Sequence, residues 1–528
     1  MTDYLIVGGG SAGCVLAARL SEDPHVHVTL LEAGAPDSSV LIHCPAGLAA
    51  LARGTPLVWN LASVPQPGLN GRSNYQPRGK VLGGSSAVNA MIYMRGRPAD
   101  YDHWAALGNP GWSFEEVLPY FKKAEDNARG ADAWHGSGGP QHVMDLRDPN
   151  PYAQRFVQAG VQAGYAHNLD FNAEQQAGVG LYQVTQQGGE RMSAAKAYLT
   201  PHLTRPNLTV ITGALTTRIL IESRRAVGVA FLQSGQLHAL RARREVLLCA
   251  GSLMSPAILM RSGIGPGSHL QSLGIDVLHD LPGVGQNLHD HPDVVLLTEA
   301  PQGTELFGLS AKGALNILKG IWQWRKQRRG LLTTNFAEAG GFIKSQASEP
   351  VEDLQLHFVV AKLLDHGRKT VWGHGYACHV CVLQPQSRGS VMLASADPLT
   401  PPRIDPALLS HPEDVARLVW GVRRTREILS QPALRYGGAQ EHVSSRGATT
   451  DADIEAFVRK HADTVYHPVG TCRMGKDPLA VVDAHLKVHG IHGLRVVDAS
   501  VMPRITSGNT NAPVIMIAEK EASLVRER

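Results

Sequence analysis

The chain has 528 residues, 43% hydrophobic and 18% charged, which is typical of a globular protein and excludes an intrinsically disordered one. Its 50 Lys and Arg residues nearly balance its 46 Asp and Glu residues, so the formal net charge is only +4 and no nucleic-acid partner is expected. Six cysteines at this length predict reduced thiols, and the glycine-interrupted N-terminal stretch does not resemble a signal peptide. We therefore expect a cytoplasmic protein.

The N-terminal region predicts a parallel β–α–β unit. An apolar strand over residues 4–7 ends at three glycines, a helix follows over 14–20, and a second apolar strand over 26–31 ends at Glu32. Strands joined through a helix in this way lie parallel in one sheet.

The remaining elements follow from composition and hydrophobic periodicity. Residues 36–111 are rich in Pro, Gly and Asn, and we expect extended loops there. Helices are expected over residues 113–126, 151–164 and 513–524. Strands are expected over residues 210–221, 227–232, 245–250, 354–360, 376–383 and 493–497, with the first two paired antiparallel.

Gly8, Gly10 and Gly13 follow the first strand with G-x-G-x-x-G spacing. Glycines at these positions allow a sharp turn, and they let a pyrophosphate lie at the N-terminus of the following helix, where free N–H groups favour an anion. Glu32, at the end of the second strand, can hold both hydroxyls of a ribose. An acid there disfavours a 2′-phosphate, so these residues predict a site for FAD or NAD.

A second glycine-rich segment, residues 78–89, contains Gly83-Gly84 followed by two serines. Its flexible backbone and its hydroxyl groups suit contact with a flat ring or a diphosphate. An ordinary surface loop has the same composition, so the segment on its own decides nothing.

Together with later motifs, these residues resemble the glucose–methanol–choline (GMC) flavin oxidoreductases. Residues 79–102 are similar to the first signature of that family, and residues 251–265 are similar to the second. Further similar motifs are Tyr466-His467-Pro468-Val469-Gly470-Thr471, Val497-Asp498-Ala499-Ser500 and Gly508-Asn509-Thr510-Asn511-Ala512-Pro513. The resemblance runs along nearly the whole chain, and it is strongest toward bacterial choline dehydrogenases and membrane-associated aliphatic alcohol dehydrogenases.

The resemblance implies FAD, and not NAD, as the cofactor. The residues that it places against the cofactor are Gly8, Gly10, Ser11, Ala12, Gly13, Glu32, Ala33, Gly83, Gly84, Asn89, Ala90, Leu215, Asp498, Ala499 and Asn509. Some oxidases of the family attach the flavin covalently through a histidine, but the aligned region here, residues 85–88, has no such nucleophile. We therefore expect non-covalent FAD.

The expected fold class is α/β (α+β): a Rossmann-like parallel sheet that binds FAD, with a second substrate domain built on an antiparallel sheet with helices. The FAD-binding domain is expected to combine residues 1–155, 190–300 and 458–528. The substrate domain is expected to combine residues 156–189 and 301–457. By resemblance, the family's N-terminal region spans about residues 3–298 and its C-terminal region about residues 384–520.

His467 is the expected catalytic residue, because loss of hydride from an alcohol requires its hydroxyl proton to leave and an imidazole suits that role. By resemblance, Asn511 is the second catalytic position, where an amide orients the substrate oxygen. Asn511 also precedes Ala512-Pro513, so it equally fits a plain helix N-cap.

The expected reaction is oxidation of a primary aliphatic or aromatic alcohol to its aldehyde, with Tyr466 and Glu338 as substrate-contact candidates. Choline-oxidising relatives pair the ammonium group with a carboxylate in a context similar to that of Glu338, so choline dehydrogenase is the main alternative. A structural acid is the other interpretation of Glu338. An FAD-containing lyase and a non-enzymatic flavoprotein are the rivals from other classes.

Two groups of residues have the composition of a metal site, and we expect neither to bind a metal. Cys378 and Cys381 lie three apart in an alternating apolar run, which puts them on opposite faces of a strand. His289-Asp290-His291 lies in a stretch that resembles a family motif, and we expect it to support the fold.

Residues 312–329 contain six basic residues and no acid, with two tryptophans among aliphatic side chains. A basic amphipathic helix of this kind favours the headgroup region of an anionic membrane, although a solvated helix with its apolar stripe packed inside the domain has the same pattern. Membrane contact would make a respiratory quinone the electron acceptor, whereas a soluble oxidase would use oxygen. The sequence does not predict the oligomeric state.

Overall fold

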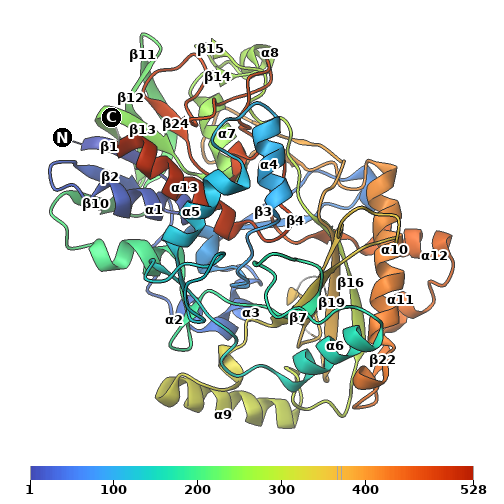
Figure 1. The fold of residues 1–528 in the computed structure, drawn as a ribbon. Coiled ribbons are helices and arrows are strands. Elements are labelled where there is room, and N and C mark those ends of the chain that lie inside the picture. Colours follow the sequence, from blue (N-terminus) through green and yellow to red (C-terminus); the bar gives the residue numbers. More distant parts are fainter. Residues whose placement is uncertain (1, 365–366, 370, 527–528) are drawn as a thin grey trace.

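The computed structural model describes residues 2–364, 367–369 and 371–526, and two large β-sheets organise them (Figure 1). The first sheet has seven strands in the order β10-β2-β1-β13-β12-β11, with β24 also paired to β13. These strands are β1 (Thr2–Val7), β2 (Val28–Leu31), β10 (Leu208–Ile211), β11 (Leu215–Glu222), β12 (Arg225–Gln233), β13 (Gln236–Leu248) and β24 (Leu494–Val496).

The central pairs of this sheet are parallel, and β11 and β12 extend it as an antiparallel edge. Helix α1 (Ser11–Leu20) connects β1 to β2 and supplies the crossover that parallel pairing requires. The Rossmann-like parallel sheet predicted from the sequence is therefore confirmed.

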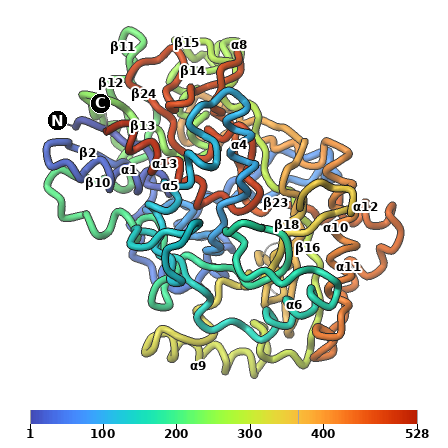
Figure 2. The backbone as a smooth tube through the Cα atoms, in the orientation of Figure 1, coloured from blue at the N-terminus to red at the C-terminus, as the bar shows by residue number. Residues whose placement is uncertain are grey.

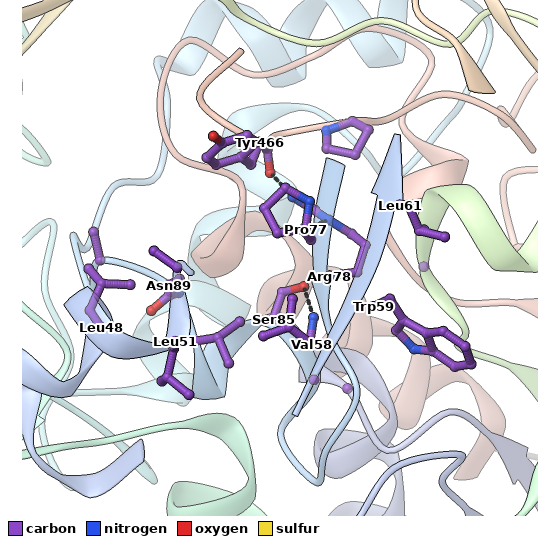
Figure 3. A pocket seen from close by; sticks show the side chains of 18 of the residues that line it. Leu48, Leu51, Val58, Trp59, Leu61, Pro77, Arg78, Ser85, Asn89 and Tyr466 are labelled. Atoms are coloured by element: carbon purple, nitrogen blue, oxygen red, sulfur yellow. Dashed lines mark hydrogen bonds between the residues drawn. The ribbon is translucent and has the colours of Figure 1, made fainter. Parts of the chain in front are cut away.

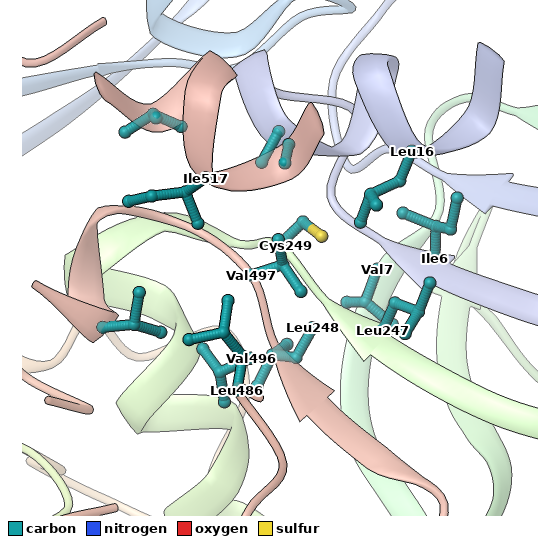
Figure 4. Close-up of a cluster of buried hydrophobic side chains, with 14 of the residues drawn as sticks. Ile6, Val7, Leu16, Leu247, Leu248, Cys249, Leu486, Val496, Val497 and Ile517 are labelled. Carbon is teal, nitrogen blue, oxygen red and sulfur yellow. The ribbon is translucent and has the colours of Figure 1, made fainter. Parts of the chain in front are cut away.

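Apolar side chains from both ends of the chain fill the core beside this sheet (Figure 4). Val7, Leu16, Leu248 and Ile517 are each at most 2% exposed, and the last of them comes from helix α13 (Asn511–Arg526). Figure 2 shows how the first and last segments of the chain run together in this part of the molecule. Burial of each such side chain contributes about 1.5–3 kcal/mol, so the two ends stabilise one body.

The second sheet is antiparallel, in the order β22-β16-β19-β18-β17-β7, with β23 also paired to β16. Its strands are β7 (Gly178–Leu181), β16 (Pro292–Glu299), β17 (Ala337–Ile343), β18 (Leu354–Val359), β19 (Gly375–Val382), β22 (Gln440–Glu441) and β23 (Asp463–Thr464). Helices α6 (Pro151–Gln162), α10 (Pro412–Leu429) and α12 (Asp451–His461) bury apolar side chains against it. The predicted antiparallel sheet with helices is confirmed.

Helix α9 (Ala311–Gln327) lies at the periphery of the second body, at the lower end of the view in Figure 1. Within the described residues, no helix combines the length and the hydropathy that crossing a membrane requires.

Two expectations about elements need correction. The single strand expected over residues 210–221 is two strands, because a turn at Gly213 (φ +67°) separates β10, which pairs with β2, from β11. The loops expected over residues 36–111 include a hairpin of β3 (Val58–Ala62) and β4 (Tyr75–Gly79) and helix α4 (Pro98–Ala106). Cross-strand pairing outweighs the loop-like composition there.

The boundary expected at residue 300 is also misplaced. Strand β16 belongs to the second sheet although the expected boundary assigned it to the FAD-binding segments. Its apolar run cannot reveal which sheet it joins, because the pairing partner β19 is distant in sequence. Strand β23 also joins the second sheet, although it lies within the expected FAD-binding segment 458–528. The rest of the division into domains stays a prediction.

Candidate active site

A cavity of about 880 Å³ lies between the two sheets. Its wall combines the ends of β1 and β2, the β3–β4 hairpin, residues of β18 and the segments around residues 466 and 509. Figure 3 shows one part of this wall, where Leu51, Trp59, Asn89 and Tyr466 surround the space from different elements. Such a concave, mostly apolar space with a few polar groups is the usual form of a cofactor and substrate site.

The turn between β1 and α1 has the backbone geometry of an anion site. Gly8 has φ +101°, and a Cβ there would lie 2.6 Å from the carbonyl oxygen of Cys249. A Cβ on Gly13 would lie 1.9 Å from the carbonyl oxygen of Gly8, so only glycine lets the helix pack this close to the strand. Gly10 occupies the N-cap position of α1 and has no side chain to accept a hydrogen bond. The first N–H groups of the helix therefore remain available to a ligand.

The two glycine-rich loops pack backbone against backbone. The Gly83 N–H donates to the Gly9 carbonyl at 2.7 Å, and a Cβ on Gly84 would lie 2.7 Å from the Cα of Gly10. The composition of residues 78–89 alone allowed a free surface loop. Instead, this segment forms the second wall of the nucleotide end of the cavity.

Glu32 is buried at the end of β2, and its carboxylate accepts the Gly9 N–H at 2.8 Å and the Gly34 N–H at 2.7 Å. Burial raises the pKa of Glu32 to about 7, and the two N–H donors oppose that rise. Each carboxylate oxygen keeps a second lone pair, so the residue still fits a ribose diol.

Backbone contacts of Tyr466 and His467 fix the position of the His467 side chain. Tyr466 has φ +68°, a conformation that non-glycine residues rarely adopt, and its carbonyl accepts from the half-buried Arg78 guanidinium at 2.7 Å. The His467 N–H donates to the Asp290 carboxylate at 2.8 Å. Strained backbone that is held by such contacts is typical of functional sites.

A chain of hydrogen bonds sets which nitrogen of His467 carries the proton. His291 Nε2 lies 3.1 Å from the Thr506 carbonyl, which can only accept, so Nε2 carries the proton and Nδ1 of the same ring is an acceptor. His291 Nδ1 lies 3.1 Å from His467 Nδ1, which must then donate. His467 Nε2 is left with its lone pair, 3.4 Å from the Asn509 amide nitrogen.

Both rings are neutral. Burial lowers the pKa of His291 to about 4. Burial, followed by the neighbouring His291 and His357, lowers the pKa of His467 well below its usual value. A neutral imidazole with an unprotonated nitrogen at the cavity is ready to accept a proton.

Family models of the N- and C-terminal parts of GMC oxidoreductases match residues 2–293 and 385–518. The chain belongs to the GMC oxidoreductase family. The prediction of a flavin-dependent oxidoreductase is confirmed.

This GMC oxidoreductase has relatives of similar length. It is 46% identical to an alcohol dehydrogenase [acceptor] from Pseudomonas putida over 99% of this chain and 96% of that protein. It is 42% identical to an oxygen-dependent choline dehydrogenase from Brucella ovis over 100% of this chain and 96% of that protein. A solved structure of pyridoxine 4-oxidase from Mesorbium loti matches with a TM-score of 0.89 and 33% identity, covering 100% of both chains. A solved structure of formate oxidase matches with a TM-score of 0.91 and 26% identity, covering 100% of this chain and 98% of that chain.

Most of the predicted site residues line the cavity of this GMC oxidoreductase. They are Gly8, Gly10, Ser11, Ala12, Glu32, Ala33, Gly84, Asn89, Ala90, Leu215, Tyr466, His467, Asp498, Ala499, Asn509 and Asn511. Gly13 and Gly83 lie behind the lining, where they bring the backbone segments together.

Asn511, the expected second catalytic residue, lines the cavity, but the amide that contacts His467 is that of Asn509. Asn511 begins α13 and accepts the Ser11 hydroxyl at 2.7 Å, so it ties two helix N-termini together. Asn509 contacts His467, as described above, and had been expected only as a cofactor contact. Sequence spacing could not separate the two, because the turn that precedes α13 decides which amide faces the histidine.

Glu338, for which the sequence left a substrate role and a structural role open, lies away from the cavity. Its side chain is buried outside the cavity lining and accepts from the Asn150 N–H at 2.6 Å and the Thr334 hydroxyl at 2.5 Å. Burial raises its pKa to about 7. The structural interpretation of this acid therefore agrees with its contacts, and the substrate interpretation does not.

Sequence reasoning missed three histidines. His291 was expected only to support the fold, yet it contacts His467; its neighbour His289 does support the fold, through Asn287 and Ile505. His357 and His379 line the cavity from β18 and β19, and the alternation of those strands carries no sign of this. His379 Nδ1 lies 2.5 Å from the Asp293 carboxylate.

Cys378 and Cys381 lie in β19 and are both buried, and Cys378 packs within the apolar core. Burial raises the pKa of both thiols above the usual range, which favours the uncharged thiol over the metal-binding thiolate. Among the described residues no group of His, Cys, Asp and Glu is arranged to hold a metal ion.

Proposed function

We propose that this protein oxidises a primary, uncharged alcohol to its aldehyde, with FAD as the hydride acceptor and His467 as the proton acceptor. The observation that carries the proposal is the lone pair of His467 Nε2 beside the Asn509 amide, in the same cavity as the glycine-rich nucleotide site. A base and an amide donor at one point are what transfer of a hydroxyl proton requires.

The residues present fit FAD. The uncapped N-terminus of α1 suits the pyrophosphate, Glu32 suits the ribose, and the close approach of Gly10 and Gly84 leaves the backbone itself as the cavity wall. Bound flavin would supply the two-electron redox chemistry. We propose that it is held without a covalent bond, because residues 85–88 contain no histidine and Val88 itself lines the cavity.

In this proposal His467, Asn509 and His291 each have a separate role. His467 Nε2 takes the hydroxyl proton, the Asn509 amide donates to the substrate oxygen, and His291 holds His467 in the required tautomer. Tyr466 contributes its backbone carbonyl and its ring to the wall. A general base of this kind typically contributes about 10²–10⁴-fold to rate.

An uncharged substrate is favoured over choline by the charges of the cavity. Among the described lining residues the only carboxylates are Glu32 and Asp498, and both lie in the nucleotide part. Asp498 already accepts from Ser255 and from the Gly251 N–H. A quaternary ammonium ion would therefore lack an acidic partner, although the identity to choline dehydrogenases keeps choline as the second candidate.

The experiment is anaerobic reduction of the bound flavin by 1-octanol, benzyl alcohol and choline. We expect bleaching of the oxidised flavin by the two uncharged alcohols, and His467→Ala should keep its flavin but lose most of the rate, by about 10²–10⁴-fold. A variant within a factor of about two of the wild type would contradict the role of His467. Tighter saturation by choline would reverse the substrate assignment. Absence of bleaching by any alcohol would favour a lyase.

For the reoxidation of the flavin, we propose a quinone as acceptor and a peripheral membrane contact through residues 312–329. The support is the set of six basic residues without an acid in this segment. A soluble oxidase that uses oxygen is the alternative.

A further inference from the structure

Helix α9 carries apolar side chains on both of its faces. Gly313, Gly320 and Trp324 form the face that packs on the protein, and the Trp324 indole N–H donates to the Gly189 carbonyl at 2.8 Å. The opposite face carries Leu315, Leu318 and Trp322, which are 66%, 63% and 57% exposed. A helix on a globular protein normally presents polar residues on that side.

The outer apolar face has a basic border. Lys312, Lys319 and Lys326 recur every seven residues along one flank, and Arg325 lies on the other flank. All four are exposed, and within the described part of the chain none pairs with a carboxylate. Exposed leucine and tryptophan bordered by unpaired cations match the apolar interior and the anionic headgroups of a bilayer surface.

The same helix forms part of the cavity wall. Ile317, on the inner side, lines the cavity, as does Leu309, which lies just before the helix and is 37% exposed. Leu309 pairs with the neighbouring Trp372, which is 75% exposed. The cavity therefore reaches the surface at an apolar rim beside the N-terminal end of α9.

From this arrangement, and resting on the alcohol oxidation proposed above, we infer that the outer face of α9 docks on an anionic bilayer and that the bilayer supplies lipophilic alcohols to the cavity. A long-chain alcohol dissolves in the membrane, and the rim at Leu309 would lie close to the membrane surface once α9 is docked. The apolar chain of the alcohol then avoids the unfavourable transfer from the bilayer into water.

Docking is tested by flotation of the FAD-loaded protein with phosphatidylcholine vesicles, with and without phosphatidylglycerol. We expect flotation only with the anionic vesicles. The double variant Leu315→Gln/Leu318→Gln should lose flotation, whereas Leu169→Gln/Leu237→Gln, which changes two leucines of matching exposure (69% and 66%) elsewhere, should keep it. Bound flavin reports folding of both variants. No flotation of the wild type, or equal flotation of the two variants, overturns the docking face.

Supply from the bilayer is tested by oxidation of 1-dodecanol and 1-butanol in the same vesicles. Neutral vesicles should slow 1-dodecanol oxidation by extracting the substrate, and anionic vesicles should not slow it. The α9 double variant should be slowed by both kinds of vesicle, and 1-butanol should be oxidised equally under all conditions. Equal slowing of wild-type 1-dodecanol oxidation by both kinds of vesicle would contradict supply of the alcohol from the bilayer. Failure to oxidise either alcohol would instead contradict the proposed function, and flotation would still report docking.

Discussion

At the scale of single residues, two asparagines two positions apart make different contacts. Asn509→Ala should slow flavin reduction by alcohol by roughly tenfold or more and keep flavin affinity, since it removes a donor to the substrate oxygen. Asn511→Ala should weaken flavin retention and keep the rate of the loaded enzyme, since it frees the Ser11 hydroxyl at the N-terminus of α1. Stopped-flow reduction and flavin titration of both variants check this. The opposite pattern would restore Asn511 to the catalytic position.

Glu338 gives a pH-dependent prediction for stability. Its pKa is about 7 in the folded protein and about 4.5 in the unfolded chain. The folded protein therefore holds a proton that the unfolded chain releases, and the free energy of unfolding falls as pH rises between these values. Glu338→Gln removes this loss, and its amide can accept from the Asn150 N–H and donate to the Thr334 hydroxyl. Its stability relative to the wild type should rise by about 1–3 kcal/mol between roughly pH 5 and pH 8.

Denaturant unfolding of the two proteins at both pH values measures this difference. The preference between choline and 1-octanol should be the same in both proteins, because the carboxylate lies outside the cavity lining. A selective loss of choline oxidation in the variant would show that Glu338 acts on the substrate after all.

At the scale of elements, the β1–α1 turn depends on one close approach. Gly13→Ala would place a Cβ 1.9 Å from the Gly8 carbonyl oxygen, so α1 would have to move away from β1. We expect loss of bound flavin and a lower melting temperature, measured by flavin absorbance and by calorimetry. Gly447→Ala is the control, because it has an ordinary helical φ of −79° and nothing within 4 Å of the added Cβ. Full flavin content in Gly13→Ala would refute the close packing.

At the scale of the whole molecule, the acceptor decides how the flavin is reoxidised. With a short-chain ubiquinone analogue under anaerobic conditions, we expect faster reoxidation of the alcohol-reduced flavin than with dissolved oxygen. The apolar character of the cavity is the physical reason, because an apolar quinone is bound there with little desolvation cost. Reoxidation by oxygen at the higher rate, with stoichiometric hydrogen peroxide, would identify an oxidase.

Local patterns in the sequence determined much of this protein. The glycine spacing before α1, the acid after β2 and the alternation of β18 and β19 act within a few residues, so the parallel unit, the antiparallel strands and the family motifs were all predictable. The motif around His467 likewise identified a residue that lines the cavity. Nearest-neighbour geometry along the chain is enough for such features.

Only the tertiary structure decided which side chains meet. His291 directly precedes β16, and His467 follows β23. The two histidines are far apart in sequence and come into contact because β16 pairs with β23. The same long-range packing buried Glu338 away from the cavity and brought Asn509, instead of Asn511, to His467. It also turned Leu315 and Trp322 outward on α9, since the glycines on the opposite face allow the closer packing. Side-chain type and periodicity indicate that a face exists, but the direction it faces depends on what packs beside it.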